Sequence, residues 1–292
     1  MEPGHLPVLP EETMRFLDPQ PGEIWVDGTT GGGGHSRMIA ERIGPRGRLI
    51  AFDQDSAMLA MAKQRLEGFP VTAVHANFDQ VQEVLENLGI LKVNGVLADL
   101  GFSSDQMDNP ARGLSFQRNG PLDMRLDTTI GSTAADLVNT VGEAALADLI
   151  FEYGEERKSR WVAKRIVERR KERKFETTED LAELVRKCVP RSGKIDPATR
   201  VFQALRIAVN DELGALERLL SALPRVLLPG GRAGIISFHS LEDRRVKQAF
   251  RNGDLWKVRT KKPVEATDAE MARNPRSRSA KFRVAERIGD SP

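Results

Sequence analysis

The sequence predicts an α/β protein with a mostly parallel sheet and a helical insertion. Short apolar segments at residues 24–27, 49–53, 71–75 and 95–99 alternate with helix-like stretches through the first hundred residues. Strands that alternate with helices in this way form βαβ units, whose strands run parallel. A strand pattern returns at 234–238 after a long interval without one. We therefore expect one sheet that draws strands from both ends of the chain.

The interval between the two strand-rich parts predicts a separate helical domain. Residues 103–130 are rich in turn-forming Gly, Pro and Asn, and residues 132–189 have helical spacing, with N-caps expected at Ser132 and Thr177. One long amphipathic helix is expected from about 198 to 220. After 234–238 we expect a helix at 241–250 and strands at 255–259 and 281–285. The predicted domains are a sheet domain at 1–105 and 205–292, and an inserted loop and helical domain at 106–204.

Composition is that of a soluble globular protein. Of 292 residues, 40% are hydrophobic and 29% charged, which excludes an intrinsically disordered chain. No apolar run approaches the length that spans a bilayer, so no membrane partner is expected. The single cysteine, Cys188, excludes an internal disulfide framework and predicts a cytoplasmic location. The four histidines lack metal-ligand spacing, so no metal is expected.

The strongest local signal is a run of four glycines, residues 31–34, between the first apolar strand and a helix. Glycines let the backbone approach a ligand closely, and the following helix start offers unpaired N–H groups. A dinucleotide-binding turn would have a third glycine where Ser36 stands. Asp27, which ends the strand before this turn, is typical of a site for a cationic or amino-acid-bearing ligand. A nicotinamide-dependent oxidoreductase is therefore a disfavoured alternative.

Polar side chains follow each of the next three strands. Asp53 ends the second strand, where an acid accepts hydrogen bonds from ribose hydroxyls. Asn77 and Phe78 end the third, where an amide and a ring could flank adenine, although Phe78 is equally expected as a core residue. Asp99 ends the fourth strand. Because open α/β sheets bind ligands at the carboxyl ends of their strands, these residues predict one ligand site.

Basic residues concentrate in two stretches although the net charge is only +2. Residues 157–174 hold ten Lys or Arg against two acids, and residues 257–283 hold nine against three. Such stretches predict a polyanion-binding surface, and the alternative for the first is a solvated helix face. Polyanion contacts are expected on side chains that follow the 234–238 strand or lie in the irregular basic segment at 274–281. They are His239, Ser240, Asp243, Arg244, Arg276 and Arg278. The alternatives there are a helix cap by Ser240 and a solvated tail.

Further blocks of sequence are long enough to be specific to a family. They are His5–Leu9, Asp27–Ser36, Asp99–Asp108, Arg112–Phe116, Gly120–Arg125, Tyr153–Arg157, Pro197–Ile207, Ile236–Arg244 and Asn274–Ser279. In this order they resemble the bacterial 16S rRNA (cytosine-N4)-methyltransferases, the RsmH/MraW family. The resemblance extends over nearly the whole chain. Phe102 departs from it, because the family usually has Val there.

The resemblance implies a class I S-adenosylmethionine-dependent methyltransferase, a Rossmann-like fold with an inserted all-helical domain. It implies methylation of N4 of one cytidine in the decoding region of 16S rRNA, within the small ribosomal subunit. The family's contacts with S-adenosylmethionine fall on Gly33, Gly34, His35, Asp53, Phe78, Asp99 and Gln106.

For the chemistry, Asp99 or the backbone carbonyls beside it are our candidate acceptors for an N4 hydrogen, and Phe102 is expected to stack on the base. The polyanion expected at 239–244 and 276–278 is then RNA. Methyl transfer from a sulfonium is a direct displacement, so alignment of donor and acceptor is the main task. The alternative function is that of a non-catalytic RNA-binding or ribosome-assembly factor that retains the cofactor fold.

Overall fold

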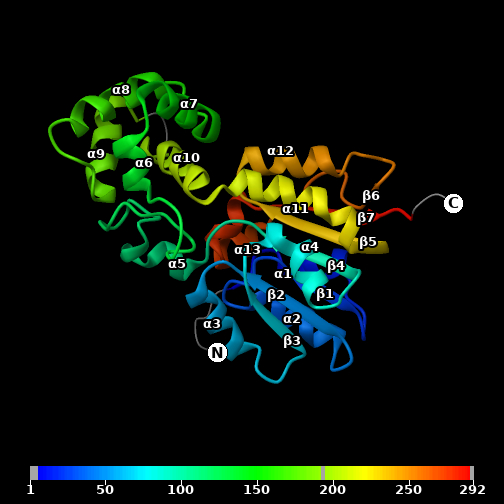
Figure 1. Cartoon of the computed structure of the whole chain (residues 1–292). Helices are drawn as coiled ribbons and strands as arrows, with labels where there is room; N and C mark the ends of the chain where they lie inside the picture. The colour runs from blue at the N-terminus through cyan, green and yellow to red at the C-terminus, as the bar shows by residue number, and fades with distance from the viewer. Residues whose placement is uncertain (1–5, 192–194, 290–292) are drawn as a thin grey trace. The chain divides into compact units, whose positions relative to one another are not determined.

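The computed structural model describes residues 6–191 and 195–289. A seven-stranded sheet lies at its centre, with the strands in the order β3-β2-β1-β4-β5-β7-β6 (Figure 1). The strands are β1 (Ile24–Asp27), β2 (Arg48–Asp53), β3 (Val71–His75), β4 (Val93–Asp99), β5 (Leu227–Ser237), β6 (Trp256–Val258) and β7 (Lys281–Arg287). The first five strands in this order run parallel, whereas β7 is antiparallel to β5 and β6 is antiparallel to β7. The expected mostly parallel sheet is confirmed.

Helices cover both faces of this sheet. The adjacent residues Val96 and Leu97 of β4 belong to two different buried clusters, and successive side chains of a strand point to opposite faces. The cluster with Val96 includes side chains of α4, α11 and α12, and the cluster with Leu97 includes side chains of α1 and α2. The helices of this part are α1 (Pro10–Leu17), α2 (Gly34–Ile43), α3 (Ser56–Arg65), α4 (Val81–Asn87), α11 (Glu212–Val226), α12 (Ser240–Ala249) and α13 (Asp268–Arg273), with 3₁₀ turns η1 (Phe78–Gln80) and η3 (Pro275–Ser279).

The chain divides into two compact units. The sheet unit comprises Met1–Phe102 and Leu213–Pro292, and the helical unit comprises Ser103–Glu212. From the sequence, the helical domain is predicted to begin at residue 106 and to end at residue 204. The second boundary differs because α10 (Ala198–Asn210) belongs as a whole to the helical unit.

The single long helix expected at 198–220 is wrong. The structure has two helices, α10 and α11, separated by Asp211, whose backbone is left-handed with φ 47° and ψ 40°. A left-handed residue ends an α-helix, and Asp tolerates this conformation better than most side chains. Apolar residues continue at helical spacing on both sides of Asp211, for example Leu205 and Leu213, so the pattern does not reveal a break of one residue.

The strand β5 begins at Leu227, seven positions before the expected start at Gly234. Residues Pro229, Gly230 and Gly231 read as a turn in the sequence, yet they lie within the strand. The pairing of β4 with β5 shifts register here, between Val93 and Gly95. An irregularity of this kind absorbs extra residues without ending the pairing.

The helical unit contains α5 (Ser104–Asp108), η2 (Pro110–Arg112), α6 (Ala134–Thr140), α7 (Glu143–Gly154), α8 (Ser159–Arg170), α9 (Thr178–Cys188) and α10. The helix α7 packs against α8 and α10, and α9 contacts α8 and α10. The expected N-cap at Thr177 is confirmed, because its side chain accepts a hydrogen bond from the N–H of Asp180. The cap of α6 is Thr133 rather than the expected Ser132.

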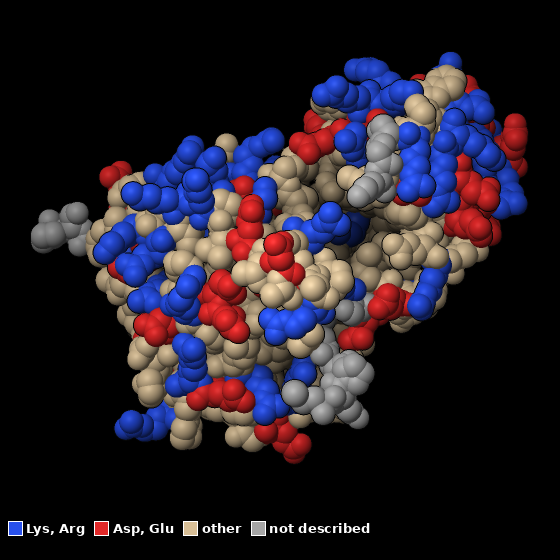
Figure 2. Space-filling view, turned by 180° about the vertical axis from the view of Figure 1, so that it is seen from behind, with Lys and Arg blue, Asp and Glu red and all other residues tan. Residues whose placement is uncertain are grey.

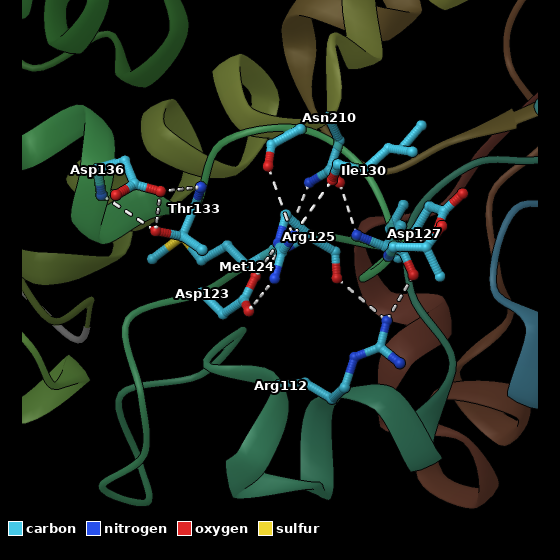
Figure 3. A network of polar contacts seen from close by, with 12 residues as sticks. Arg112, Asp123, Met124, Arg125, Asp127, Ile130, Thr133, Asp136 and Asn210 are labelled. Carbon is cyan, nitrogen blue, oxygen red and sulfur yellow. Dashed lines mark hydrogen bonds and ion pairs between the residues drawn. The ribbon is translucent and has the colours of Figure 1, made fainter.

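The long loop before α6 is held by side chains that bind its backbone (Figure 3). The guanidinium of Arg112 donates to the carbonyls of Arg125 and Leu126, at 3.1 and 2.7 Å. Asn210 accepts from the N–H of Leu126 at 2.7 Å and donates to the carbonyl of Met124 at 2.8 Å. Residues 124–126 are therefore anchored to both η2 and α10, so the loop has a defined shape despite its turn-rich sequence.

No helix among the described residues is long and apolar enough to cross a membrane.

Candidate cofactor and substrate site

Three acidic side chains lie at the carboxyl ends of neighbouring parallel strands. Asp27 ends β1, Asp53 ends β2 and Asp99 ends β4. Strand β1 pairs with β2 on one side and β4 on the other, so the three ends meet at one edge of the sheet. The structure thus brings together the acids that the sequence singled out.

The glycine turn between β1 and α2 has the conformation that glycine permits. Gly33 has φ 81°, in the left-handed region, and directly precedes α2. Gly34 is needed for space instead, because a Cβ there would lie 3.2 Å from Cδ of Pro7. The missing side chain of Gly34 therefore makes room for the N-terminal segment. His5, the first residue of the motif that ends at Leu9, lies outside the described residues.

Ser36 explains why the turn departs from a dinucleotide fingerprint. Its hydroxyl donates to Oδ2 of Asp27 at 2.6 Å, and the N–H of Thr29 donates to Oδ1 at 3.1 Å. Burial raises the pKa of Asp27 to about 6, although these two hydrogen bonds partly oppose the shift. Asp27 thus orders both sides of the turn. The role of Ser36 was missed by sequence analysis, although its place in the glycine pattern was the available signal.

Asp53 holds the glycine turn against β2. Its Oδ2 accepts from the N–H of Gly31 at 2.7 Å, and its Oδ1 accepts from the N–H of Asp55 at 2.8 Å. Burial raises the pKa of Asp53 to about 6, against the effect of both hydrogen bonds. The carboxylate expected to bind a ribose therefore also fixes the position of the turn.

Asp99 has a buried oxygen without a partner. Its Oδ1 makes no hydrogen bond with any described residue, whereas its Oδ2 lies 3.5 Å from Nδ1 of His35. The N–H of Asp99 donates to the hydroxyl of Thr29 at 2.6 Å, which fixes the strand end. Burial, followed by the charges of Asp27 and Glu242, raises the pKa of Asp99 well above its usual range. An unpartnered buried acceptor is costly, so this oxygen indicates a ligand site.

His35 connects this acid to the N-terminal segment. Its Nε2 lies 2.9 Å from the carbonyl oxygen of Val8, and the ring is buried at the start of α2. The contact with Val8 was not foreseen, because a backbone carbonyl leaves no mark in a sequence.

Phe78 is buried in η1 beside the start of the glycine turn. A Cβ on Gly28 would lie 3.0 Å from its Cβ, so the two backbones approach closely. The neighbouring Asn77 caps η1, and its amide donates to Oε1 of Gln54 at 3.2 Å. The amide expected to flank adenine is thus bound to the segment that follows β2.

Phe102 follows β4 by three positions and is half-buried. Its carbonyl accepts a hydrogen bond of 3.3 Å from Nη1 of Arg276, which lies in η3. The antiparallel direction of β7 explains how η3 reaches this edge, since Lys281 at the start of β7 pairs with Ser237 at the end of β5. Arg276, expected to bind RNA, is therefore tied to the loop that carries Phe102.

Gln106 belongs to the helical unit, where it lies in α5 and is buried. Its side chain accepts from the N–H of Ser103 at 2.9 Å, and the hydroxyl of Ser103 accepts from the N–H of Gln106 at 3.1 Å. This reciprocal pair is a capping box. The contact of Gln106 with the cofactor stays a prediction.

The four residues expected to bind RNA after β5 differ in their surroundings. Asp243 accepts hydrogen bonds from Arg283 at 2.6 and 3.2 Å, which ties α12 to β7. His239 lies with Nε2 3.2 Å from Oε1 of Glu242. Ser240 and Arg244 are exposed, as is Arg278 in η3.

Comparison with known proteins supplies the family. Residues 2–288 match the profile of the MraW methylase family. Proteins named ribosomal RNA small subunit methyltransferase H are similar along nearly the whole chain. The one from Geotalea uraniireducens is 48% identical over 97% of this chain and 98% of its own. The one from a Nostoc species is 52% identical over 99% and 94%, and the one from Sorangium cellulosum is 49% identical over 98% and 91%. This chain therefore belongs to the MraW methylase family.

Proposed function

We propose that this protein transfers a methyl group from S-adenosylmethionine to N4 of one cytidine in the decoding region of 16S rRNA. The observation that carries the proposal is the buried, unpartnered Oδ1 of Asp99, at the strand end between the glycine turn and Phe102. The names of the relatives support an RNA of the small ribosomal subunit as substrate. We place the reaction in the cytoplasm, on RNA within the small subunit.

The residues present suit this cofactor. S-adenosylmethionine carries a positive sulfonium and an ammonium group, and three carboxyl groups meet at this edge of the sheet. Two buried oxygens here have no partner among the described residues, Oδ1 of Asp99 at the end of β4 and the hydroxyl of Thr30 in the glycine turn. We assign Gly33, Asp53 and Phe78 to cofactor binding, with Gly34 and His35 shaping the turn around them. The family resemblance adds Gln106 to the proposed set.

The bound cofactor supplies an electrophilic methyl group on its sulfonium. Its transfer to N4 would leave S-adenosylhomocysteine and release one N4 proton to water. Cytosine N4 is a poor nucleophile because its lone pair is delocalised into the ring. A carboxylate that accepts one N4–H bond favours a pyramidal nitrogen and stabilises the positive charge that develops there. Asp99 fills this role, because its Oδ1 is held without a partner inside the protein.

Phe102 is the proposed platform for the target base. Bases taken out of an RNA helix are commonly held by stacking on aromatic side chains. The hydrogen bond from Arg276 fixes the backbone of Phe102, so the ring is presented by a restrained loop. Arg244 and Arg278 are exposed cations near the same edge and are proposed to bind phosphates, with Ser240 and His239 beside them. Asp243 is left out of this surface because Arg283 neutralises it.

The test is nucleoside mass spectrometry of 16S rRNA from a strain that lacks the gene. We expect N4-methylcytidine in the decoding region to disappear, to return with the wild-type gene, and to stay absent with Asp99→Ala. Persistence of the modification in the deletion strain would refute the substrate assignment. Recovery with Asp99→Ala would instead support a role as an assembly factor, if calorimetry also detected no cofactor binding.

A further inference from the structure

The helix α8 carries an exposed tryptophan among basic residues. Trp161 is 48% exposed, whereas Trp25 and Trp256 are buried. On a helix, residues three and four positions away are the neighbours of a side chain. For Trp161 these neighbours are Lys164 and Arg165 within α8 and Lys158 at its N-cap, and Arg157 lies in the turn just before the helix. All four are exposed.

The basic stretch at 157–174 separates into two parts with different roles. In the second part, Arg169 binds Oδ1 of Asp180 at 2.9 Å, and Arg173 binds the same atom at 2.6 Å. Arg170 donates to two carbonyls, those of Val138 and Val141, at 2.8 and 2.7 Å. Arg169 and Arg170 are half-buried and hold the helical unit together through these contacts.

The first part has few such constraints. Among its cations, Arg165 is paired with Glu168 at 2.6 Å, and Lys164 lies 4.0 Å from the same carboxylate. Both pairs are exposed, and exposed pairs of this kind are weak. The guanidinium of Arg165 also lies 5.8 Å from the centre of the Trp161 ring, so the indole is already in a cationic environment. Figure 2 shows Lys and Arg gathered over much of the helical unit.

The combination indicates a particular ligand chemistry. An exposed indole offers a flat face on which an unpaired base can stack, and flanking cations attract the phosphates on either side of that base. Base–aromatic stacking tolerates any base, so such a surface binds single-stranded RNA without reading its sequence. An acidic protein would match the charge but would leave the ring face without a partner.

We propose that Arg157, Lys158, Trp161, Lys164 and Arg165, the α8 surface, bind an unpaired segment of RNA by stacking one base on Trp161. All five residues belong to the helical unit, and none of them is among the residues assigned above to the cofactor or the target base. The proposal rests on the proposed function, because it takes the RNA substrate as the polyanion. It adds a contact that anchors the RNA without taking part in the reaction.

The tryptophan itself reports on the test. In the full-length protein, Trp161 is the exposed member of three tryptophans, so stacking of a base is expected to quench its fluorescence. We expect single-stranded RNA to quench the emission, and Trp161→Leu to abolish that change. Affinity for RNA should fall about tenfold in Trp161→Leu, a loss typical of one stacked base. In the double variant Lys158→Gln and Lys164→Gln, the slope of log affinity against log salt concentration should become shallower by about two.

Matched controls separate this surface from general charge effects. Lys187→Gln changes an exposed lysine at the end of α9 and should leave both RNA affinity and quenching unchanged. All variants should bind S-adenosylmethionine as the wild type does, which shows that they are folded.

Wild-type RNA affinity in Trp161→Leu, or quenching by poly-glutamate but not by RNA, would overturn the proposal. Neither result would touch the proposed function, because that is judged by N4-methylcytidine in the deletion strain.

Discussion

The imidazole of His35 and the carboxyl group of Asp99 face each other at the end of β4, with Nδ1 3.5 Å from Oδ2. The other ring nitrogen, Nε2, lies 2.9 Å from the carbonyl of Val8, which can only accept a hydrogen bond. Nε2 therefore carries a proton. The remaining ring nitrogen, Nδ1, faces Asp99, so the charge of one side chain acts directly on the other.

This pairing predicts that His35→Gln changes the pH dependence of methyl transfer. A protonated imidazole favours the ionised form of Asp99, so its removal should shift the ionisation of Asp99 to higher pH. We expect the acidic limb of the rate profile to move upward in pH and turnover at neutral pH to fall about tenfold. Single-turnover rates between pH 5 and 9 measure this.

The companion variant Asp99→Asn serves as the control for the pair. Because the two residues act together, the double variant should lose little more than Asp99→Asn alone. Strictly additive losses would mean that His35 acts independently of Asp99.

Asp53→Ala should weaken cofactor binding. The substitution removes the acceptor of the Gly31 N–H and so frees the glycine turn from β2. Loss of a charged hydrogen bond of this kind corresponds to about a 10- to 100-fold rise in Kd. Calorimetry with S-adenosylmethionine measures the effect, and Asp254→Ala, which changes an exposed carboxylate before β6, is the matched control. An unchanged Kd in Asp53→Ala would remove this residue from the site.

Cofactor affinity should rise with pH through about 6. The pKa values of Asp27 and Asp53 are raised to about 6 by burial, so both groups are mostly neutral at pH 5 and ionised at pH 8. Ionised carboxylates attract the sulfonium of S-adenosylmethionine, whereas S-adenosylhomocysteine lacks that charge. The pH dependence should therefore be steeper for the sulfonium ligand, and equal slopes for the two ligands would contradict this explanation.

The same raised pKa values predict how stability depends on pH. The folded state binds the protons of Asp27 and Asp53 more tightly than the unfolded state does. The stability that comes from these bound protons is therefore fully present below about pH 4. It is lost as pH rises through about 6. Asp27→Asn should therefore flatten the fall in unfolding free energy between pH 4 and 7, measured by urea denaturation. A slope as steep as that of the wild type would show that Asp27 does not titrate in this range.

Arg276 and Arg278, two residues apart in η3, should have different roles. Arg276 binds the carbonyl of Phe102, so Arg276→Ala should lower turnover about tenfold with a small change in RNA affinity. Arg278 is exposed, so Arg278→Ala should weaken RNA binding. It should also make the slope of log RNA affinity against log salt concentration shallower by about one. Filter binding at several salt concentrations and single-turnover rates separate the two effects. Identical phenotypes would mean that both arginines contact RNA.

Much of the site could be predicted because it depends on local pattern. Asp27, Asp53 and Asp99 each end a short apolar strand, and parallel strands bring such ends together. The contacts of Val8 with His35 and of Arg276 with Phe102 could not be predicted. They join residues 27 and 174 positions apart, through backbone carbonyls that every residue possesses. The break at Asp211 was hidden for another reason, since one left-handed residue does not disturb the apolar period on either side.

The antiparallel strand β7 also protects the protein from aggregation. It lies between β5 and β6, and Phe282 and Val284 within it are fully buried. A chain truncated before Lys281 would expose the backbone edge of β5 along Ile235 and Ile236 and leave β6 without a partner. Unpaired, apolar strand edges recruit other chains. A frameshift or nick in this short segment should therefore yield insoluble protein, rather than a soluble enzyme that has lost only its RNA contacts.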